Sequence, residues 1–267
     1  MKVTKMHGIG NDYIYIDCFK QQMEDKSALS IKLSHRHFAV GGDGVIYICP
    51  SEKADFFMDM YNADGSRGLM CGNGIRCVGK YVYDNGLTDK TVLKIETLSG
   101  IKTLWLNIED GKVKTVRVGM GKASFREDYI KKIILVAGRT WEVTALSVGN
   151  PHLVTFIDED IDSLDLERIG PFFEKHEDFP EGVNTEFVNI LPDGSLKMRV
   201  WERGSGETLA CGTGATALTA TAIRLGYCEK SAIVRLKGGE LYIEQDENGE
   251  LFMTGEAVTV FDAEVYI

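Results

Sequence analysis

The sequence predicts an α/β (α+β) protein made of two similar halves, each mostly strand with one main helix. The segment at 58–87 recurs at 198–227, and the two copies align at one constant offset without a gap. In both copies a strand-like run leads through a Gly/Ser-rich turn to Cys-Gly-x-Gly and then to an apolar, helix-like stretch. A length of 267 residues is enough for about two domains of ordinary size. Strand-like runs outnumber helical patterns, which favours a sheet-rich fold in each half.

Short runs of β-branched or alternating apolar residues predict the strands. In chain order they are 13–17, 45–49, 56–61, 92–96, 113–118, 133–136, 153–157, 197–201, 233–236 and 240–243. Turns with Gly after Asp or Asn separate several of them, at 64–65, 110–111, 193–194 and 248–249. The last of these turns is typical of a hairpin.

Two main helices are predicted over 72–85 and 212–225, where apolar residues recur at helical spacing. A glycine follows each of them closely, Gly86 or Gly226, as is common where a helix ends. We expect a further short helix over 162–168. The boundary between the halves is expected near 119–131, which gives domains 1–118 and 119–261, with the C-terminal strand 262–267 joining the first.

The charge balance excludes several classes of protein. The chain has 30 Lys+Arg and 40 Asp+Glu, a formal net charge of −10, and no basic stripe that would bind nucleic acid. Its longest apolar run is far shorter than the ~20 residues that span a membrane, and no secretory leader is recognisable. We therefore expect a cytoplasmic protein whose six cysteines are reduced thiols.

Two of the cysteines, Cys71 and Cys211, occupy equivalent positions of the repeat, where a turn becomes a helix. A helix N-terminus favours negative charge, so it lowers the pKa of a thiol there and attracts carboxylates. Two thiols of similar pKa on opposite sides of one carbon would suit racemisation, with one removing a proton and the other delivering one. The other four cysteines are interpreted as small buried side chains. No Cys or His spacing predicts a metal site, and no dinucleotide fingerprint is complete.

Other interpretations of the same residues stay open at this point. Cys71 or Cys211 could be a covalent nucleophile with His152 as its base, in a hydrolase or transferase. The glycine-rich helix ends could also belong to a non-catalytic anion-binding module.

The motifs resemble those of the diaminopimelate epimerase family, pyridoxal-phosphate-independent amino-acid epimerases, along essentially the whole chain. They are HGIGNDY (7–13), GGDG (41–44), NADGS (62–66), CGNGIRC (71–77), GNPH (149–152), GVNTEF (182–187) and ERGSGETLACGTGA (202–215). The resemblance implies two halves, each a barrel-like sheet around a central helix, with the active site in the cleft between them. It also implies interconversion of LL- and meso-diaminopimelate for lysine and peptidoglycan synthesis, without cofactor or metal, in a homodimer.

The resemblance also implies roles for particular residues. Cys71 and Cys211 would be the catalytic acid/base pair, and His152 and Glu202 would tune the thiols. The implied substrate-binding residues are Asn11, Asn62, Gly72, Asn73, Asn150, Asn184, Glu202, Arg203, Gly212 and Thr213. Arg203, with its planar guanidinium, suits a bidentate grip on the distal carboxylate of the amino-acid substrate.

One position departs from the family pattern. Many members carry Gln where this chain has Gly44, so we assign Gly44 no side-chain role. An epimerase of the same superfamily that acts on histidine, proline or hydroxyproline is the main alternative.

Overall fold

A computed structural model describes residues 1–266 and divides the chain into two compact units. Unit 1 contains residues 1–118 and the residues from Thr254 onward, and unit 2 contains Gly119–Met253. The chain leaves unit 1 within strand β8 (Lys112–Lys122) and returns within strand β18 (Glu250–Glu256). The N-terminal and C-terminal segments therefore belong to the same unit.

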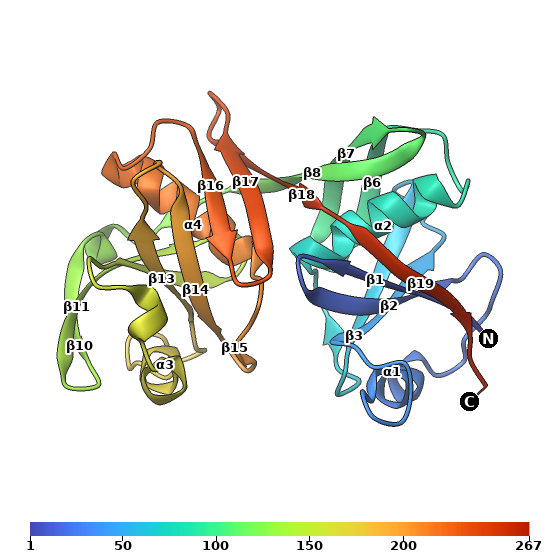
Figure 1. Cartoon of the computed structure of the whole chain (residues 1–267), viewed down its shortest axis with the longest axis horizontal. Coiled ribbons are helices and arrows are strands. Elements are labelled where there is room, and N and C mark those ends of the chain that lie inside the picture. Colours follow the sequence, from blue (N-terminus) through green and yellow to red (C-terminus); the bar gives the residue numbers. More distant parts are fainter. Residues whose placement is uncertain (267) are drawn as a thin grey trace. The chain divides into compact units, whose positions relative to one another are not determined.

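Unit 1 surrounds one long helix with strands. Its helices are α1 (Lys26–Ser34) and α2 (Gly72–Asp84). Its strands, besides the shared β8 and β18, are β1 (Lys2–Gly8), β2 (Asn11–Asp17), β3 (Gly44–Cys49), β4 (Phe56–Asn62), β5 (Arg67–Gly68), β6 (Val92–Thr97), β7 (Gly100–Glu109) and β19 (Val258–Glu264). Strand β2 is parallel to β3, β4 is parallel to β6, and the pairs β1–β2, β1–β19, β3–β4 and β6–β7 are antiparallel. Figure 1 shows α2 among these strands.

Strand β2 shows why both faces of the unit 1 sheet are apolar. Ile14 and Ile16 pack in a cluster with Leu33 of α1. Tyr15 alternates with them along the strand, so it faces the other side, where its hydroxyl donates to the carbonyl of Gly74 in α2. A strand buried on both faces contains a continuous apolar run rather than a simple alternation. Helices α1 and α2 therefore cover opposite faces of this part of the sheet.

Unit 2 repeats this arrangement. Its helices are α3 (Leu166–Glu174) and α4 (Gly212–Leu225), with short 3-10 turns η1 (Glu127–Tyr129) and η2 (Ile161–Ser163). Its other strands are β9 (Ser124–Phe125), β10 (Lys132–Val136), β11 (Arg139–Ser147), β12 (Pro151–Phe156), β13 (Asn184–Ile190), β14 (Leu196–Glu202), β15 (Gly206–Glu207), β16 (Ser231–Leu236) and β17 (Gly239–Gln245). The pairs β12–β13 and β14–β16 are parallel, whereas β13–β14 and β16–β17 are antiparallel, as in the equivalent strands of unit 1.

The predicted repeat is confirmed and extends further than the sequence indicated. Helix α4 follows α2, and strand β14 follows β4, at the same offset that relates the two cysteine motifs. Helix α3 follows α1 at this offset too, at both its first and its last residue. These last two helices share a fold position without sharing a sequence motif.

The ten predicted strands and both main helices are present, but the short helix predicted over 162–168 is wrong in position. Asp160 caps the 3-10 turn η2, and Asp165 caps α3 by accepting from the backbone N–H of Arg168. Two capping aspartates close together in the chain start two separate elements, and α3 continues to Glu174.

Other elements differ from the predictions in extent or were not predicted. Helix α1 and strands such as β1 and β7 were not predicted. The C-terminal strand predicted over 262–267 overlaps β19, which begins earlier and ends at Glu264, and residue 267 lies outside the described part of the chain. Within residues 1–266 no helix is long and apolar enough to cross a bilayer.

Candidate active site

Cys71 is the N-cap of α2, the first of two matching thiol positions. Its backbone is extended, with φ −126° and ψ 118°, and its sulfur accepts a hydrogen bond from the backbone N–H of Gly74 at 3.3 Å. The thiol donates to Asn11 Oδ1 at 3.0 Å. A cysteine thus takes the role that Ser or Asp usually has at a helix start, and the first-turn amides stabilise negative charge on its sulfur.

Two predicted binding residues of unit 1, Asn11 and Asn62, lie at the ends of strands. Asn11 begins β2, and its side-chain amide donates to Asp43 Oδ2 at 2.7 Å. Because Asp43 holds the amide nitrogen, the oxygen of Asn11 is oriented toward the thiol. Asn62 ends β4, and its amide donates to Ser66 Oγ at 3.0 Å. Burial and the nearby Cys71 and Asp43 raise the pKa of the Tyr13 phenol well above its usual range.

The first turn of α2 has a buried cation beneath it. Arg76 is fully buried and donates from Nη1 to the carbonyl of Gly72 at 3.2 Å and to Asn73 Oδ1 at 3.0 Å. Burial lowers the pKa of the guanidinium, whereas the nearby Cys77 and Cys71 sulfurs oppose that shift. The side-chain oxygen of Asn73 is therefore engaged inside unit 1. Gly72 and Asn73 can serve an anion through first-turn backbone amides.

Cys211 is the N-cap of α4 and has the same backbone conformation, with φ −123° and ψ 105°. Its sulfur accepts from the backbone N–H of Gly214 at 3.4 Å, and its thiol donates to Glu202 Oε2 at 3.1 Å. Glu202 ends β14, and Thr208 donates to its other oxygen. Gly212 and Thr213 form the first turn, and Thr213 Oγ1 lies 3.5 Å from the sulfur.

The two thiols differ most in their surrounding charges. Cys211 is only 4% exposed, and burial together with the carboxylates of Glu202 and Glu186 raises its pKa well above the usual range. Burial likewise raises the pKa of Glu202, while the bonds from Thr208 and Cys211 oppose that shift. The raised pKa of Cys211 disfavours a thiolate at this position in the free protein.

A chain of hydrogen bonds leads from the interior of unit 2 to the first turn of α4. His152 is fully buried, with Nδ1 2.7 Å from Glu186 Oε1 and Nε2 3.0 Å from Asn150 Oδ1. Asn150 in turn donates to Thr213 Oγ1 at 3.4 Å. Both ring nitrogens of His152 are therefore held, one by Glu186 and the other by Asn150. His152 therefore contacts Asn150 and Glu186, and the thiol lies near the end of this chain.

The two remaining predicted residues of unit 2 are also linked. Asn184 begins β13, and its side-chain oxygen accepts from the backbone N–H of Arg203 at 2.8 Å. The guanidinium of Arg203 donates to the carbonyl of Glu181 at 2.9 Å. Gly182 lies under this side chain, since a Cβ there would come 2.8 Å from Arg203 Cδ. The long side chain is thus held by main-chain groups.

Three residues of these environments were not predicted from the sequence: Asp43, Arg76 and Glu186. Asp43 lies inside the motif GGDG, and Arg76 lies inside CGNGIRC together with Cys71. Their positions in these motifs were the signal that could have identified them. Glu186 follows GVNT and directly precedes the apolar pair Phe187 and Val188, and a charged residue beside such a pair in a strand is a signal for a paired buried group.

The backbone explains why position 44 has no side chain. A Cβ on Gly44 would lie 2.1 Å from the carbonyl oxygen of Tyr61, which is far below any real contact. Gly44 pairs with Asn62 across β3 and β4, so the two strands approach closely at this point. A glutamine here would require the strands to separate.

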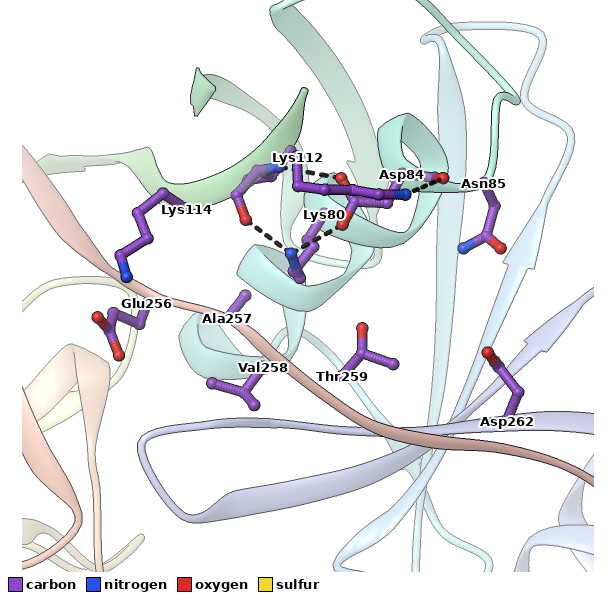
Figure 2. A pocket seen from close by; sticks show the side chains of 11 residues that line it. Lys80, Asp84, Asn85, Lys112, Lys114, Glu256, Ala257, Val258, Thr259 and Asp262 are labelled. Atoms are coloured by element: carbon purple, nitrogen blue, oxygen red, sulfur yellow. Dashed lines mark hydrogen bonds and ion pairs between the residues drawn. The ribbon is translucent and has the colours of Figure 1, made fainter. Parts of the chain in front are cut away.

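A hollow of about 470 Å³ in unit 1 does not contain these residues. It lies at the C-terminal end of α2, beside β8 and β19 (Figure 2). Lys80 Nζ pairs with Asp84 Oδ2 at 2.7 Å and donates to the carbonyl of Val113 at 2.6 Å, while Lys112 donates to the carbonyl of Asp84 (Figure 2). Lys80 and Asp84 neutralise each other in this hollow, and we assign it no substrate. In the described part of the chain, no group of three or more His, Cys, Asp or Glu side chains could hold a metal ion.

Comparisons with known proteins agree on one family. The diaminopimelate epimerase family model matches residues 3–126 and 144–260. Diaminopimelate epimerase from Acetivibrio thermocellus is 50% identical, over 99% of this chain and 98% of its own. Those from Methanococcus maripaludis strain C5 and Agathobacter rectalis are 48% and 49% identical, each over 100% of both chains.

Solved structures with low sequence identity share the fold. A phenazine biosynthesis protein of the PhzF family from Bacillus anthracis has a TM-score of 0.75 at 18% identity, covering 100% of this chain and 99% of its own. A hydroxyproline epimerase from Agrobacterium vitis has a TM-score of 0.73 at 17% identity, covering 99% of this chain and 90% of its own. At this level of identity the likeness concerns the fold alone.

Proposed function

The chain belongs to the diaminopimelate epimerase family and is an isomerase, and from this premise we propose how its residues act. It interconverts LL- and meso-diaminopimelate by moving a proton at one α-carbon. The observation that carries the proposal is the pair of cysteines, Cys71 and Cys211, each the N-cap of the main helix of its unit at equivalent repeat positions.

The reaction requires one thiol from each unit to reach the same α-carbon from opposite sides. In the free enzyme Cys71 is the thiolate and Cys211 is the thiol. In the first direction of the reaction Cys71 is therefore the base and Cys211 the acid. The thiolate of Cys71 takes the α-proton and becomes a thiol, and Cys211 delivers its proton to the other face and becomes a thiolate. The carboxylates of Glu202 and Glu186, which raise the pKa of Cys211, support this starting arrangement. The opposite epimer reacts by the same steps with the roles exchanged.

Binding uses the helix ends and the polar residues beside them. The first-turn amides of Gly72, Asn73, Gly212 and Thr213 stabilise the carboxylate of the reacting centre, where negative charge grows as the carbanion forms. Arg203 binds the distal carboxylate, and its guanidinium is already positioned by the carbonyl of Glu181. The asparagines Asn11, Asn62, Asn150 and Asn184 bind the remaining polar groups. His152 and Glu202 tune the thiol of Cys211.

We propose that the enzyme acts without pyridoxal phosphate and in the cytoplasm, since catalysis by two thiols needs a reducing compartment. Units 1 and 2 are its two domains. The exposed apolar side chains of β19, Val260 at 53% and Phe261 at 43%, support a homodimer, which light scattering after size exclusion would measure.

Proton exchange in deuterated water tests the proposed function. LL-diaminopimelate, histidine and proline are incubated in parallel, and we expect deuterium at the α-carbon of diaminopimelate alone. Cys71→Ser and Cys211→Ser should each lower the epimerisation rate by at least ~100-fold, because each removes one acid/base group. Cys228→Ser is the control and should leave the rate unchanged.

Two outcomes would contradict the proposal. Exchange with proline or histidine in place of diaminopimelate would overturn the substrate. A substrate adduct on the enzyme in intact-mass analysis during turnover would show a covalent nucleophile instead of a two-base reaction.

A further inference from the structure

Two thiols of unit 1 outside the proposed active site lie side by side. Strands β2 and β3 run parallel with Asp17 opposite Ile48, and the backbone N–H of Cys18 donates to the carbonyl of Ile48 at 3.0 Å. The next pair in this register is Cys18 and Cys49, and their sulfurs are hydrogen-bonded. Neighbouring strands lie ~4.8 Å apart, which is within the Cα separation that a disulfide tolerates.

A cation contacts one of the two sulfurs. Lys26, the first residue of α1, places Nζ 3.4 Å from Cys49 Sγ and 2.7 Å from Asp59 Oδ2. The other oxygen of Asp59 accepts from Arg67 Nε at 2.7 Å. Two cations thus share one carboxylate, and the excess positive charge lies beside the sulfur of Cys49. A thiolate there would complete the charge balance of the cluster.

The two thiols are therefore unequal. The hydrogen bond from Cys18, together with the Lys26 charge, lowers the pKa of Cys49 to about 7, although burial opposes this shift. The same hydrogen bond raises the pKa of Cys18, and burial adds to that rise. One sulfur is available as a nucleophile and its neighbour keeps a proton, which is the arrangement that redox-reactive cysteine pairs need.

We propose that Cys49 is a peroxide-reactive thiolate and Cys18 its resolving thiol, so that unit 1 carries an oxidative modification site independent of epimerisation. The Cys49 thiolate attacks one oxygen of hydrogen peroxide, the O–O bond breaks, and the departing hydroxide takes up a proton to become water. Cys18 then attacks the sulfur of the resulting sulfenic acid, the S–O bond breaks, and water leaves with the proton of Cys18. Two electrons pass from the two sulfurs to one peroxide, which yields a disulfide and two waters.

The site is separated from the proposed catalytic residues of the same unit. Cys18 directly follows the end of β2, whereas Asn11 begins that strand. Seven residues of extended chain span ~23 Å. Oxidation of this pair therefore does not directly involve the catalytic thiols.

Mass spectrometry of the whole enzyme tests the site. The protein is exposed to one equivalent of hydrogen peroxide at pH 7, remaining thiols are blocked with iodoacetamide, and peptides are mapped without reduction. We expect a peptide pair joined by Cys18 and Cys49, lighter than the sum of the reduced peptides by two hydrogen atoms, to form faster than any oxidation of Cys228. In Cys18→Ser, dimedone should trap a sulfenic acid on Cys49.

Substitutions at Lys26 separate the effect of its charge on Cys49 from any effect on folding. Lys26→Met keeps most of the apolar stem and should slow oxidation of Cys49 several-fold at pH 7, because loss of the charge raises the pKa of Cys49 and lowers its thiolate fraction. Lys26→Arg restores the charge and should restore most of the rate. Both variants should keep the wild-type epimerase rate, which shows that they are folded. The proposal is overturned if wild-type Cys49 is recovered as a carbamidomethylated thiol after peroxide, or if Lys26→Met oxidises as fast as Lys26→Arg.

Discussion

At the scale of single residues, the two equivalent cysteines have acquired different environments. The thiol of Cys71 donates to a neutral amide oxygen of Asn11, and the buried guanidinium of Arg76 lies nearby in α2. The thiol of Cys211 donates to a carboxylate, Glu202. Equal positions in the repeat therefore do not imply equal protonation, because each half adds its own charges around the sulfur.

Glu202→Gln tests the charge effect on Cys211. The negative carboxylate raises the pKa of the thiol, so a neutral amide of similar shape should lower it. We expect the pH midpoint of Cys211 alkylation by iodoacetamide to move to lower pH. Epimerisation should fall by about 10- to 100-fold, because the acid and base no longer start in matched protonation states.

A matched control for this substitution is Glu207→Gln. Glu207 pairs with Arg199 and Lys237 and makes no bond to Cys211, so its removal should leave the alkylation midpoint unchanged. An unchanged midpoint in Glu202→Gln would show that burial and Glu186, and not Glu202, hold the proton on Cys211.

At the scale of elements, the start of α4 is packed more tightly than its end. A Cβ on Gly214 would lie 2.7 Å from Glu186 Oε1 and 3.2 Å from Cys211 Sγ. Gly226, at the other end of the helix, has φ +78° and nothing within 4 Å of an added Cβ. One glycine is thus required for space around the thiol, and the other for a left-handed backbone at the C-cap.

Gly214→Ala and Gly226→Ala should separate activity from stability. We expect Gly214→Ala to lower kcat more than about tenfold, because the added methyl displaces the thiol and the carboxylate that supports His152. Gly226→Ala should cost about 1 kcal/mol of unfolding free energy and leave kcat unchanged. Urea unfolding and steady-state kinetics on both variants measure the two effects, and equal kcat values would contradict the packing argument.

At the scale of the whole molecule, each unit has its own apolar interior. In unit 2, Phe173 of α3 is fully buried, with edge contacts to the rings of Trp141 and Phe187. Its neighbour Phe172 is 59% exposed. Two adjacent residues of the same type therefore differ only in which side of α3 they occupy, which makes them a direct test of unit 2 packing.

Phe173→Ala should destabilise unit 2 by about 3–5 kcal/mol, whereas Phe172→Ala should cost less than about 0.5 kcal/mol. Native-state hydrogen exchange on both variants checks this expectation. In Phe173→Ala, protection should fall first for residues 119–253, and less for unit 1. An equal fall in both units would show that they unfold as a single cooperative body.

Local sequence patterns predicted much of the fold and part of the site. Strands such as residues 45–49 and the helices after Cys71 and Cys211 follow from apolar periodicity and from glycine turns, which are short-range signals. Helix α1 was not predicted, because its sequence, KSALSIKLS, mixes polar and apolar residues without a clear apolar face. The register of β19 beside β1 could not be predicted either, since it joins the two ends of the chain.

The sequence by itself determined the family, the repeat and the identity of the two cysteines, since these depend on residue types at fixed spacings along one chain. Apart from Glu202, which the resemblance already implied for the thiols, tertiary structure alone decided which charged groups surround each sulfur. Glu186 and Glu202 reach Cys211 from separate strands, and Lys26 reaches Cys49 from a helix. The charge around a thiol sets its pKa, and that charge comes from residues distant in sequence that only folding brings together.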